Sequence, residues 1–190
     1  NAIDKWILSR LSETISEVDS LLEKYEFARA CELLYHFAWD DLCDWYLELS
    51  KETFAGADSD KTKRVLGHVL DQLLRLLHPV MPFITEQLWI TLTGAESLVI
   101  ASWPVANAAH VDKASEKLIA QMQEIITDVR RFRNDQGIKT SLKIPARFVA
   151  KGAIADYASA MAFVLRLELG EIKPSAKVEI GSVKVEFDLT

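Results

Sequence analysis

The sequence has no long uninterrupted apolar run. A membrane-spanning helix needs about 20 consecutive apolar residues, and a charged residue interrupts every stretch of that length. No apolar segment with basic flanks opens the chain, which argues against a signal peptide. We therefore expect a cytoplasmic protein with no membrane partner. Helical periodicity is already present at the third residue, so we also expect a domain of a larger protein.

Cysteine is scarce as well, with only Cys31 and Cys43 in the chain. They lie twelve positions apart on one predicted helix, which would separate them by about 18 Å along its axis. A disulfide needs Cα atoms within about 7 Å of each other, so this spacing excludes an intramolecular bridge. We expect two small buried side chains in a reducing compartment.

Patterns that carry catalysis are missing too. The four histidines are scattered, and no glycine-rich phosphate loop, nucleophile elbow or cysteine–histidine pairing occurs. A di-metal bundle would repeat a glutamate–histidine pair on a second helix. We therefore interpret the carboxylates that crowd one predicted helix as solvated surface; they are Asp40, Asp41, Asp44 and Glu48. We expect no catalytic residue, no metal site and no cofactor in this chain.

What the sequence does contain is a series of amphipathic helices. Apolar residues recur at spacings of three and four, the period of a helix with one buried face. Tyr25 and Trp39 fall on such faces, and Gly94 and Gly137 stand where a left-handed glycine commonly ends a helix. The pattern predicts a short extended piece over residues 98–103. It predicts helices over residues 3–24, 27–51, 61–77, 82–92 and 112–135.

The pattern changes in the last part of the chain. A strand is predicted over residues 143–150 and a short helix over 154–167. Two alternating strands follow, over 177–180 and 183–187, with Gly181 at a two-residue hairpin turn. The expected fold is therefore mainly α. It comprises a helix bundle (1–108), a linker helix (109–142) and a small α/β unit (143–190).

The first helix carries one residue that its apolar stripe does not explain. At 100° per residue, Trp6 lies about 125° from the centre of that stripe, beside Lys5 and Arg10. An outward tryptophan between two cations is typical of a base-stacking platform with phosphate-binding groups. The alternative is that Trp6 packs on a helix outside this chain or on the loop after the second helix.

Two further basic surfaces are candidates for contact with nucleic acid. The formal net charge of −6 argues against non-specific coating, but affinity for phosphate follows the local field. The stretch 123–151 holds seven basic and three acidic residues and includes Arg130 and Arg133. The other surface is the outer face of the 61–77 helix, with Lys61, Lys63, Arg64, His68 and Arg75. The alternative for both surfaces is a plain solvated face.

Three segments carry a resemblance to a known family. They are residues 4–11 (DKWILSRL), 39–51 (WDDLCDWYLELSK) and 77–89 (LHPVMPFITEQLW). In order and spacing they resemble the anticodon-binding helical domain of valyl-tRNA synthetases, which are class I aminoacyl-tRNA synthetases. The first hundred residues carry most of the likeness, and the 43–48 run resembles the valine version of the domain. From residue 111 onward the chain is similar to the family's linker helix and small α/β unit.

The resemblance implies a helix bundle that grips the anticodon stem-loop of tRNA(Val). It also implies a monomer in which the catalytic domain of the same polypeptide attaches valine, with ATP and Mg²⁺ as cofactors of the full-length enzyme. The Lys5-Trp6 pair falls where relatives place a basic–aromatic pair near the anticodon bases. We expect the tRNA-binding residues to be Lys5, Trp6, Arg10, Lys63, Arg64, His68, Arg130 and Arg133.

Three alternatives stay open. One is a helical protein-interaction module in which Trp6 anchors a partner. Another is a metal- or ligand-binding bundle, which would need inward polar residues. The third is the corresponding domain of an isoleucyl- or leucyl-type synthetase.

Overall fold

A computed structural model describes residues 1–56 and 59–189 of the chain. The chain forms two compact units, Asn1–Ser115 and Glu116–Thr190. The helix over the predicted linker region is grouped mainly with the second unit. Over the described ranges, none of the helices combines the length and the apolar character that a membrane crossing requires.

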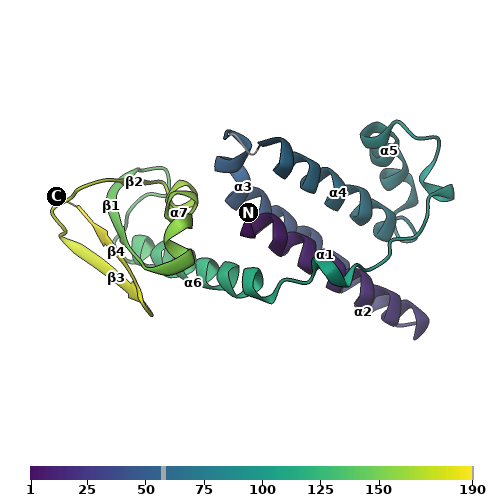
Figure 1. The fold of residues 1–190 in the computed structure, drawn as a ribbon, viewed down its shortest axis with the longest axis horizontal. Coiled ribbons are helices and arrows are strands. Elements are labelled where there is room, and N and C mark those ends of the chain that lie inside the picture. Colours follow the sequence, from purple (N-terminus) through teal and green to yellow (C-terminus); the bar gives the residue numbers. More distant parts are fainter. Residues whose placement is uncertain (57–58, 190) are drawn as a thin grey trace. The chain divides into compact units, whose positions relative to one another are not determined.

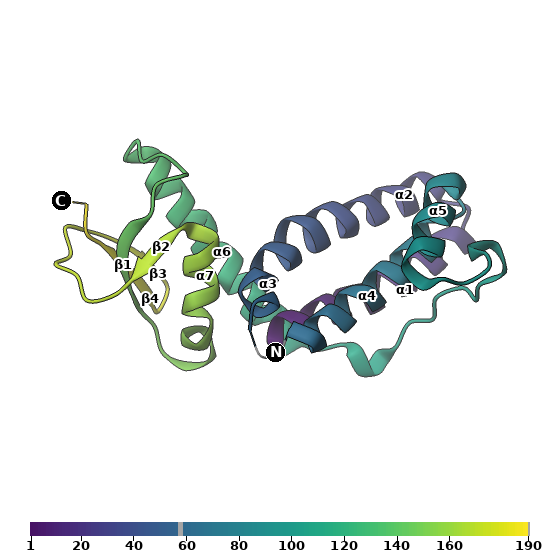
Figure 2. The ribbon, with the colours of Figure 1, turned by 90° about the horizontal axis from the view of Figure 1, so that it is seen from above.

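The first unit is a bundle of helices (Figure 1). Its main helices in chain order are α1 (Ala2–Glu23), α2 (Phe27–His36), α3 (Leu47–Phe54), α4 (Ser59–Leu77) and α5 (Pro82–Thr93). Helix α1 lies beside α4 in both ribbon views and contacts α2 and α4 (Figures 1 and 2). The helical bundle predicted from periodicity is therefore confirmed.

Helix α1 is central to this unit, and most of its faces are buried. Asn1 caps it, because its side-chain oxygen accepts a hydrogen bond from the backbone N–H of Asp4 at 2.8 Å. The predicted stripe, including Ile7, Leu11 and Ile15, lies in the core. Tyr25 was expected to continue the stripe, but it is exposed. The helix ends at Glu23, and Tyr25 takes a left-handed conformation with φ of 60° that turns it out of phase.

The second predicted helix runs without a break from α2 to α3, but its middle is a π-helix, η1 (Phe37–Tyr46). In an α-helix at 100° per residue, Phe37 and Tyr46 would point about 180° apart. The wider π-helical turns bring both side chains into the core, where they are fully buried. Trp39 and Cys43 are exposed, so their expected burial is wrong.

Helices α4 and α5 form a hairpin. The indole N–H of Trp89 donates to Oδ1 of Asp71 at 2.6 Å, and Arg75 binds the same carboxylate. At the turn, the His78 imidazole lies 2.8 Å from the Thr85 hydroxyl. Helix α5 ends as predicted at Gly94, with φ of 70°.

An irregular segment leads from α5 back across the bundle. Residues Leu98–Ile100 form a 3-10 turn, η2, and not the extended piece that was predicted. A second 3-10 turn, η3 (Ala108–His110), contacts α1. Two hydrogen bonds fasten this part of the segment to α1: the Ser12 hydroxyl donates to the Asn107 carbonyl, and the Asp112 N–H donates to the Ser9 hydroxyl, each at 2.9 Å.

The second unit is a small α/β unit, as predicted. A four-stranded sheet of order β2-β1-β4-β3 combines β1 (Ile144–Val149), β2 (Leu167–Leu169), β3 (Ala176–Ile180) and β4 (Val183–Phe187). Strands β1 and β2 are parallel, and the other pairs are antiparallel. Gly181, with φ of 55°, stands in the predicted hairpin turn. The predicted 154–167 helix is a 3-10 turn, η4 (Gly152–Tyr157), followed by α7 (Ala158–Leu165).

Helix α6 (Lys113–Asp135) packs on this sheet. The ring of Phe132 stacks on Phe187 of β4 with centroids 4.9 Å apart. Val183, Val185 and Phe187 of β4 are buried, and the charged residues Lys184 and Glu186 alternate with them. Glu186 is buried as well, in ion pairs with Arg147 and Lys184. The alternating pattern of the 183–187 segment therefore fixed the face of this strand correctly.

Candidate functional site

A shallow, open cationic groove lies on the first unit between α4, α1 and η3. It has a volume of about 420 Å³, and Leu8 and Val65 supply its apolar lining. Its remaining walls are basic or imidazole side chains: Lys61, Arg64, His68 and His110. Two of the residues predicted from the sequence, Arg64 and His68, are thus brought to one place.

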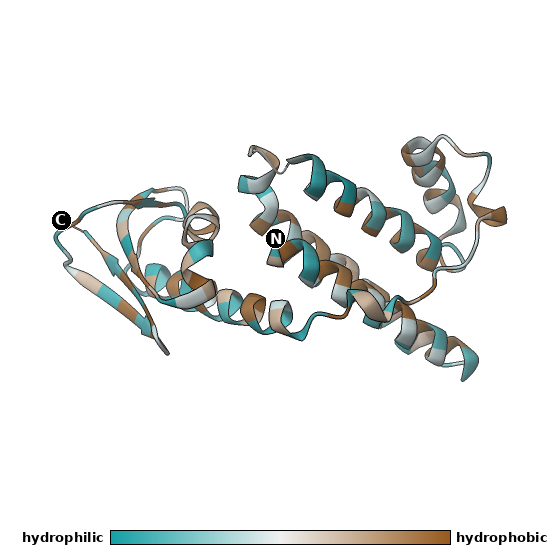
Figure 3. Ribbon diagram, viewed as in Figure 1, coloured by the Kyte–Doolittle hydropathy of each residue, from teal (hydrophilic) through white to brown (hydrophobic). Residues whose placement is uncertain are grey.

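The helical register of α4 puts these side chains on one face. Lys61, Arg64 and His68 follow one another at spacings of three and four, so they project from neighbouring turns. The opposite face of α4 buries Val69 and Leu73 against the bundle. Figure 3 shows that the first turns of α4 are hydrophilic. This amphipathic pattern explains why the cations face outward together.

The fourth wall of the groove comes from a distant part of the chain. The rings of His68 and His110 meet edge to face, with centroids 6.4 Å apart. Partial burial, and then the nearby His110, lower the pKa of His68. At neutral pH the His68 ring is therefore mostly neutral, and it can both donate and accept a hydrogen bond. Sequence reasoning missed His110, because no spacing rule links it to α4.

Lys5 lies on the same helix as Leu8, which lines this groove. It precedes Leu8 by one turn of α1, and its side chain is 66% exposed. Its ammonium lies 3.5 Å from Asp112, two residues beyond His110. The hydrogen bond from the Ser115 N–H and the pairing with Lys5 lower the pKa of Asp112, so this carboxylate is ionised at neutral pH. Lys5 therefore keeps the exposed position that was predicted, next to one competing carboxylate.

Trp6 does not lie on this surface, and its expected outward orientation is wrong. The side chain is only 4% exposed. On one side of it, Ser9 binds the backbone of Asp112, and on the other side Arg10 binds Asp41 of η1 at 3.0 Å. The residues on either side of Trp6 on α1 are thus bound to two distant segments of the chain. A ring sealed inside its own chain cannot stack on a base, so in this structure Trp6 is a core residue.

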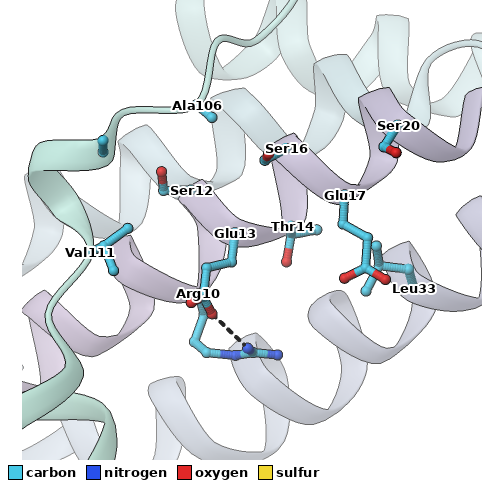
Figure 4. A pocket seen from close by; sticks show the side chains of 11 residues that line it. Arg10, Ser12, Glu13, Thr14, Ser16, Glu17, Ser20, Leu33, Ala106 and Val111 are labelled. Carbon is cyan, nitrogen blue, oxygen red and sulfur yellow. Dashed lines mark hydrogen bonds and ion pairs between the residues drawn. The ribbon is translucent and has the colours of Figure 1, made fainter. Parts of the chain in front are cut away.

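Arg10 faces a different hollow, along α1 (Figure 4). This hollow has a volume of about 630 Å³ and also contains Glu13 and Glu17. The guanidinium of Arg10 forms ion pairs with Asp41 and Glu13, each at 3.0 Å. Two carboxylates thus offset its charge, and the structure does not bring Arg10 together with the cationic groove.

The remaining predicted residues are dispersed. Lys63 is exposed on α4, but helical geometry turns it about 100° away from Arg64. Arg130 and Arg133 belong to the second unit. Arg130 is exposed, whereas Arg133 is 5% exposed, so its expected place on a phosphate-binding surface is wrong. Its guanidinium donates to three backbone carbonyls, those of Leu165, Lys139 and Leu142.

The described residues offer no alternative metal centre. Within residues 1–56 and 59–189, no three histidine, cysteine or acidic side chains gather closely enough to hold a metal ion. The carboxylates of η1 separate in space: Asp41 pairs with Arg10, and Asp40 pairs with His36 at 2.7 Å. In the part of the chain that the structure describes, the groove on α4 is the place where predicted site residues converge.

Comparisons with known proteins give a consistent result. A family model described as "Anticodon-binding domain of tRNA ligase" matches residues 4–148. The valine--tRNA ligase of Nocardia farcinica is 48% identical over an alignment of 195 positions, which covers 97% of this chain and 22% of that protein. The valine--tRNA ligase of Streptomyces avermitilis is also 48% identical, over 100% of this chain and 22% of its own length. That of Mycobacterium tuberculosis is 56% identical over 144 residues, which cover 76% of this chain and 16% of that protein. The chain spans about a fifth of the length of these relatives.

Proposed function

This chain belongs to the family of anticodon-binding domains of tRNA ligases, and on that premise we propose that its helical unit binds the anticodon stem-loop of a tRNA. The relatives named valine--tRNA ligase support a more specific proposal. The longer protein attaches valine to tRNA(Val) with ATP and Mg²⁺, in the cytoplasm and as a monomer. The chemistry then takes place in domains outside this chain.

The observation that carries the proposal is the groove formed by Lys61, Arg64, His68 and His110. An anticodon loop presents phosphates and splayed bases close together. Arg64 suits a phosphate because a guanidinium binds two oxygens at once. Neutral His68 suits the edge of a base, because it offers one donor and one acceptor. Lys5, one turn before Leu8 on α1, would give a further phosphate contact.

This assignment revises the reading surface expected from the sequence. Trp6 and Arg133 are left out because they are buried, and Arg10 because two carboxylates engage it. Arg130 remains a candidate for a phosphate contact from the second unit. Specificity would come from the imidazoles and the groove walls, while the cations fix the register of the RNA.

Binding of the full-length protein to the anticodon stem-loop of tRNA(Val), measured over a series of salt concentrations, tests the proposal. Arg64→Ala should weaken binding about ten- to hundredfold, because a hydrogen bond to a charged group contributes about 1.5–3 kcal/mol. It should also reduce the slope of log K against log salt by about one. Stem-loops with altered anticodons should bind more weakly than the cognate one.

Lys63→Ala is the matched control. It removes the same charge from the neighbouring position of the same helix, but from a different face. We expect its effect to be clearly smaller. Equal losses for the two variants would show a general charge effect and not a site, and binding that does not depend on salt would contradict RNA recognition altogether.

A further inference from the structure

The outer side of the α2–η1 helix carries a second surface, made of aromatic rings among carboxylates. Tyr35 is 58% exposed and Trp39 is 56% exposed. Their rings are parallel, with an interplanar angle of 3° and centroids 6.3 Å apart. Together with Glu32, Asp40, Cys43 and Asp44 they form what we call the acidic–aromatic stripe; all six are on exposed or half-exposed positions of one helical face.

The charges on the stripe are only partly balanced. Asp40 pairs with His36. Among the described residues, no cation lies within ion-pair distance of Glu32 or Asp44. An RNA backbone would be repelled here, so the stripe is not an extension of the cationic groove. Its chemistry is complementary to a positive partner.

The aromatic rings of the stripe favour a guanidinium over an ammonium as the bound cation. A guanidinium is planar and stacks on the face of an aromatic ring, whereas an ammonium is a compact point charge. The exposed indole of Trp39 offers such a face, and Asp40 and Asp44 follow it at one and five positions in the sequence. Arginine can stack on the ring and bind a carboxylate with the same group.

The small area of the stripe indicates that the partner belongs to the same polypeptide. A stable complex between separate proteins buries at least about 1,000 Å², and two rings on one helix supply only a part of that area. A partner in the same polypeptide has a far higher effective concentration, in the millimolar range for a short tether. The curated relatives carry this segment as about 22% of their length. Most of their chain is thus available as a tethered partner.

We propose that the acidic–aromatic stripe is the docking site for an arginine-bearing surface of the same longer polypeptide, outside this chain. The stripe then holds the anticodon-binding unit against another domain from the side of α2–η1. The inference rests on the longer polypeptide and not on RNA binding.

Cys43 makes the proposal measurable, because it is an exposed thiol on the stripe itself. Iodoacetamide labelling of the full-length protein, read at this cysteine by peptide mass spectrometry, reports whether the stripe is covered. We expect Cys43 to react at least about tenfold more slowly in the native protein than after unfolding in urea. Trp39→Glu and Asp44→Lys should each restore rapid labelling, and so should high salt for the wild-type protein.

Phe83→Glu is the control, since Phe83 is a highly exposed aromatic residue elsewhere on the unit. It should leave Cys43 protected. Rapid labelling of Cys43 in the native wild-type protein would overturn the proposal, including any version in which a separate protein is the partner. Protection that neither stripe variant relieves would overturn it as well. The assay needs no RNA, so its outcome is independent of the stem-loop experiment.

Discussion

The hydroxyl of Tyr46 donates a hydrogen bond to Oδ1 of Asp4 at 2.8 Å, while the hydroxyl of Thr62 donates to Oδ2 at 2.9 Å. One buried carboxylate thus ties the start of α1 to η1 and α4. Burial raises the pKa of Tyr46, and the bond to Asp4 raises it further, so the phenol stays protonated and keeps its donor. Removing either donor should leave one oxygen of this buried carboxylate without its side-chain hydrogen bond.

Tyr46→Phe should therefore lower the free energy of unfolding of the 190-residue chain by about 1–3 kcal/mol, the cost of a buried polar group that loses its partner. Urea denaturation followed by circular dichroism measures this. Tyr25→Phe is the control, because Tyr25 is 79% exposed and should change stability by less than about 0.5 kcal/mol. Equal effects would show that the Tyr46 hydroxyl contributes nothing specific.

Trp6→Ala should destabilise the chain by about 3–5 kcal/mol, the usual cost of emptying a buried aromatic site. Trp6→Phe should cost less, because it keeps most of the packed volume. Trp39→Ala in the same chain should have little effect, since Trp39 is exposed. Thermal unfolding distinguishes these cases. A stable, fully folded Trp6→Ala protein would contradict the sealed position of this ring.

Arg133→Ala should destabilise the second unit by at least about 3 kcal/mol, because three backbone carbonyls lose a charged donor. Arg131→Ala is the matched control two positions earlier; it removes an exposed pair with Asp128, which should matter by less than about 1 kcal/mol. Hydrogen exchange of amides in α7 and β1 would locate the loss. Indistinguishable exchange in the two variants would argue against a structural role for Arg133.

The ionisation of Asp71 makes the stability of the folded protein depend on pH. Burial alone would raise the pKa of Asp71, but hydrogen bonds from Trp89, Arg75 and Gln72 together lower it below its usual value of 3.8. A carboxyl whose pKa is lower in the folded state stabilises the fold fully above its unfolded pKa, and this stabilisation disappears as pH falls through the folded pKa. The wild-type protein should therefore exceed Asp71→Asn in stability at neutral pH, and the gap should narrow below 3.8. A gap that stays constant in acid would count against this assignment.

The regular helices could be predicted because their signals are local. The apolar stripe of α1, the glycine after α5 and the alternation in β4 each lie within a few residues of the element they define. The phase of η1 could not be predicted in the same way, because neither proline nor glycine marks the π-helix in residues 37–46. Single-helix geometry therefore did not show that Tyr46 returns to the side of Phe37.

The candidate site was only half visible in the sequence. Arg64 and His68 share one helical face, which the 3.6-residue period reveals. His110 joins them through an irregular segment, and that same segment binds Ser12 and Ser9 of α1 by hydrogen bonds that span 95 and 103 positions. Single-helix geometry carries no information on such long-range contacts, so it gave the right face for α4 and the wrong one for Trp6.

The π-helix makes the packing of Tyr46 depend on the number of residues between Phe37 and Tyr46. From Phe37 to Tyr46 the backbone takes nine steps, whereas two α-helical turns would take about seven. Shortening this stretch by one residue would swing Tyr46 away from Asp4. Shortening it by two would allow ordinary α-helical turns and return the ring to the same side. Deleting two residues should therefore destabilise the bundle less than deleting one.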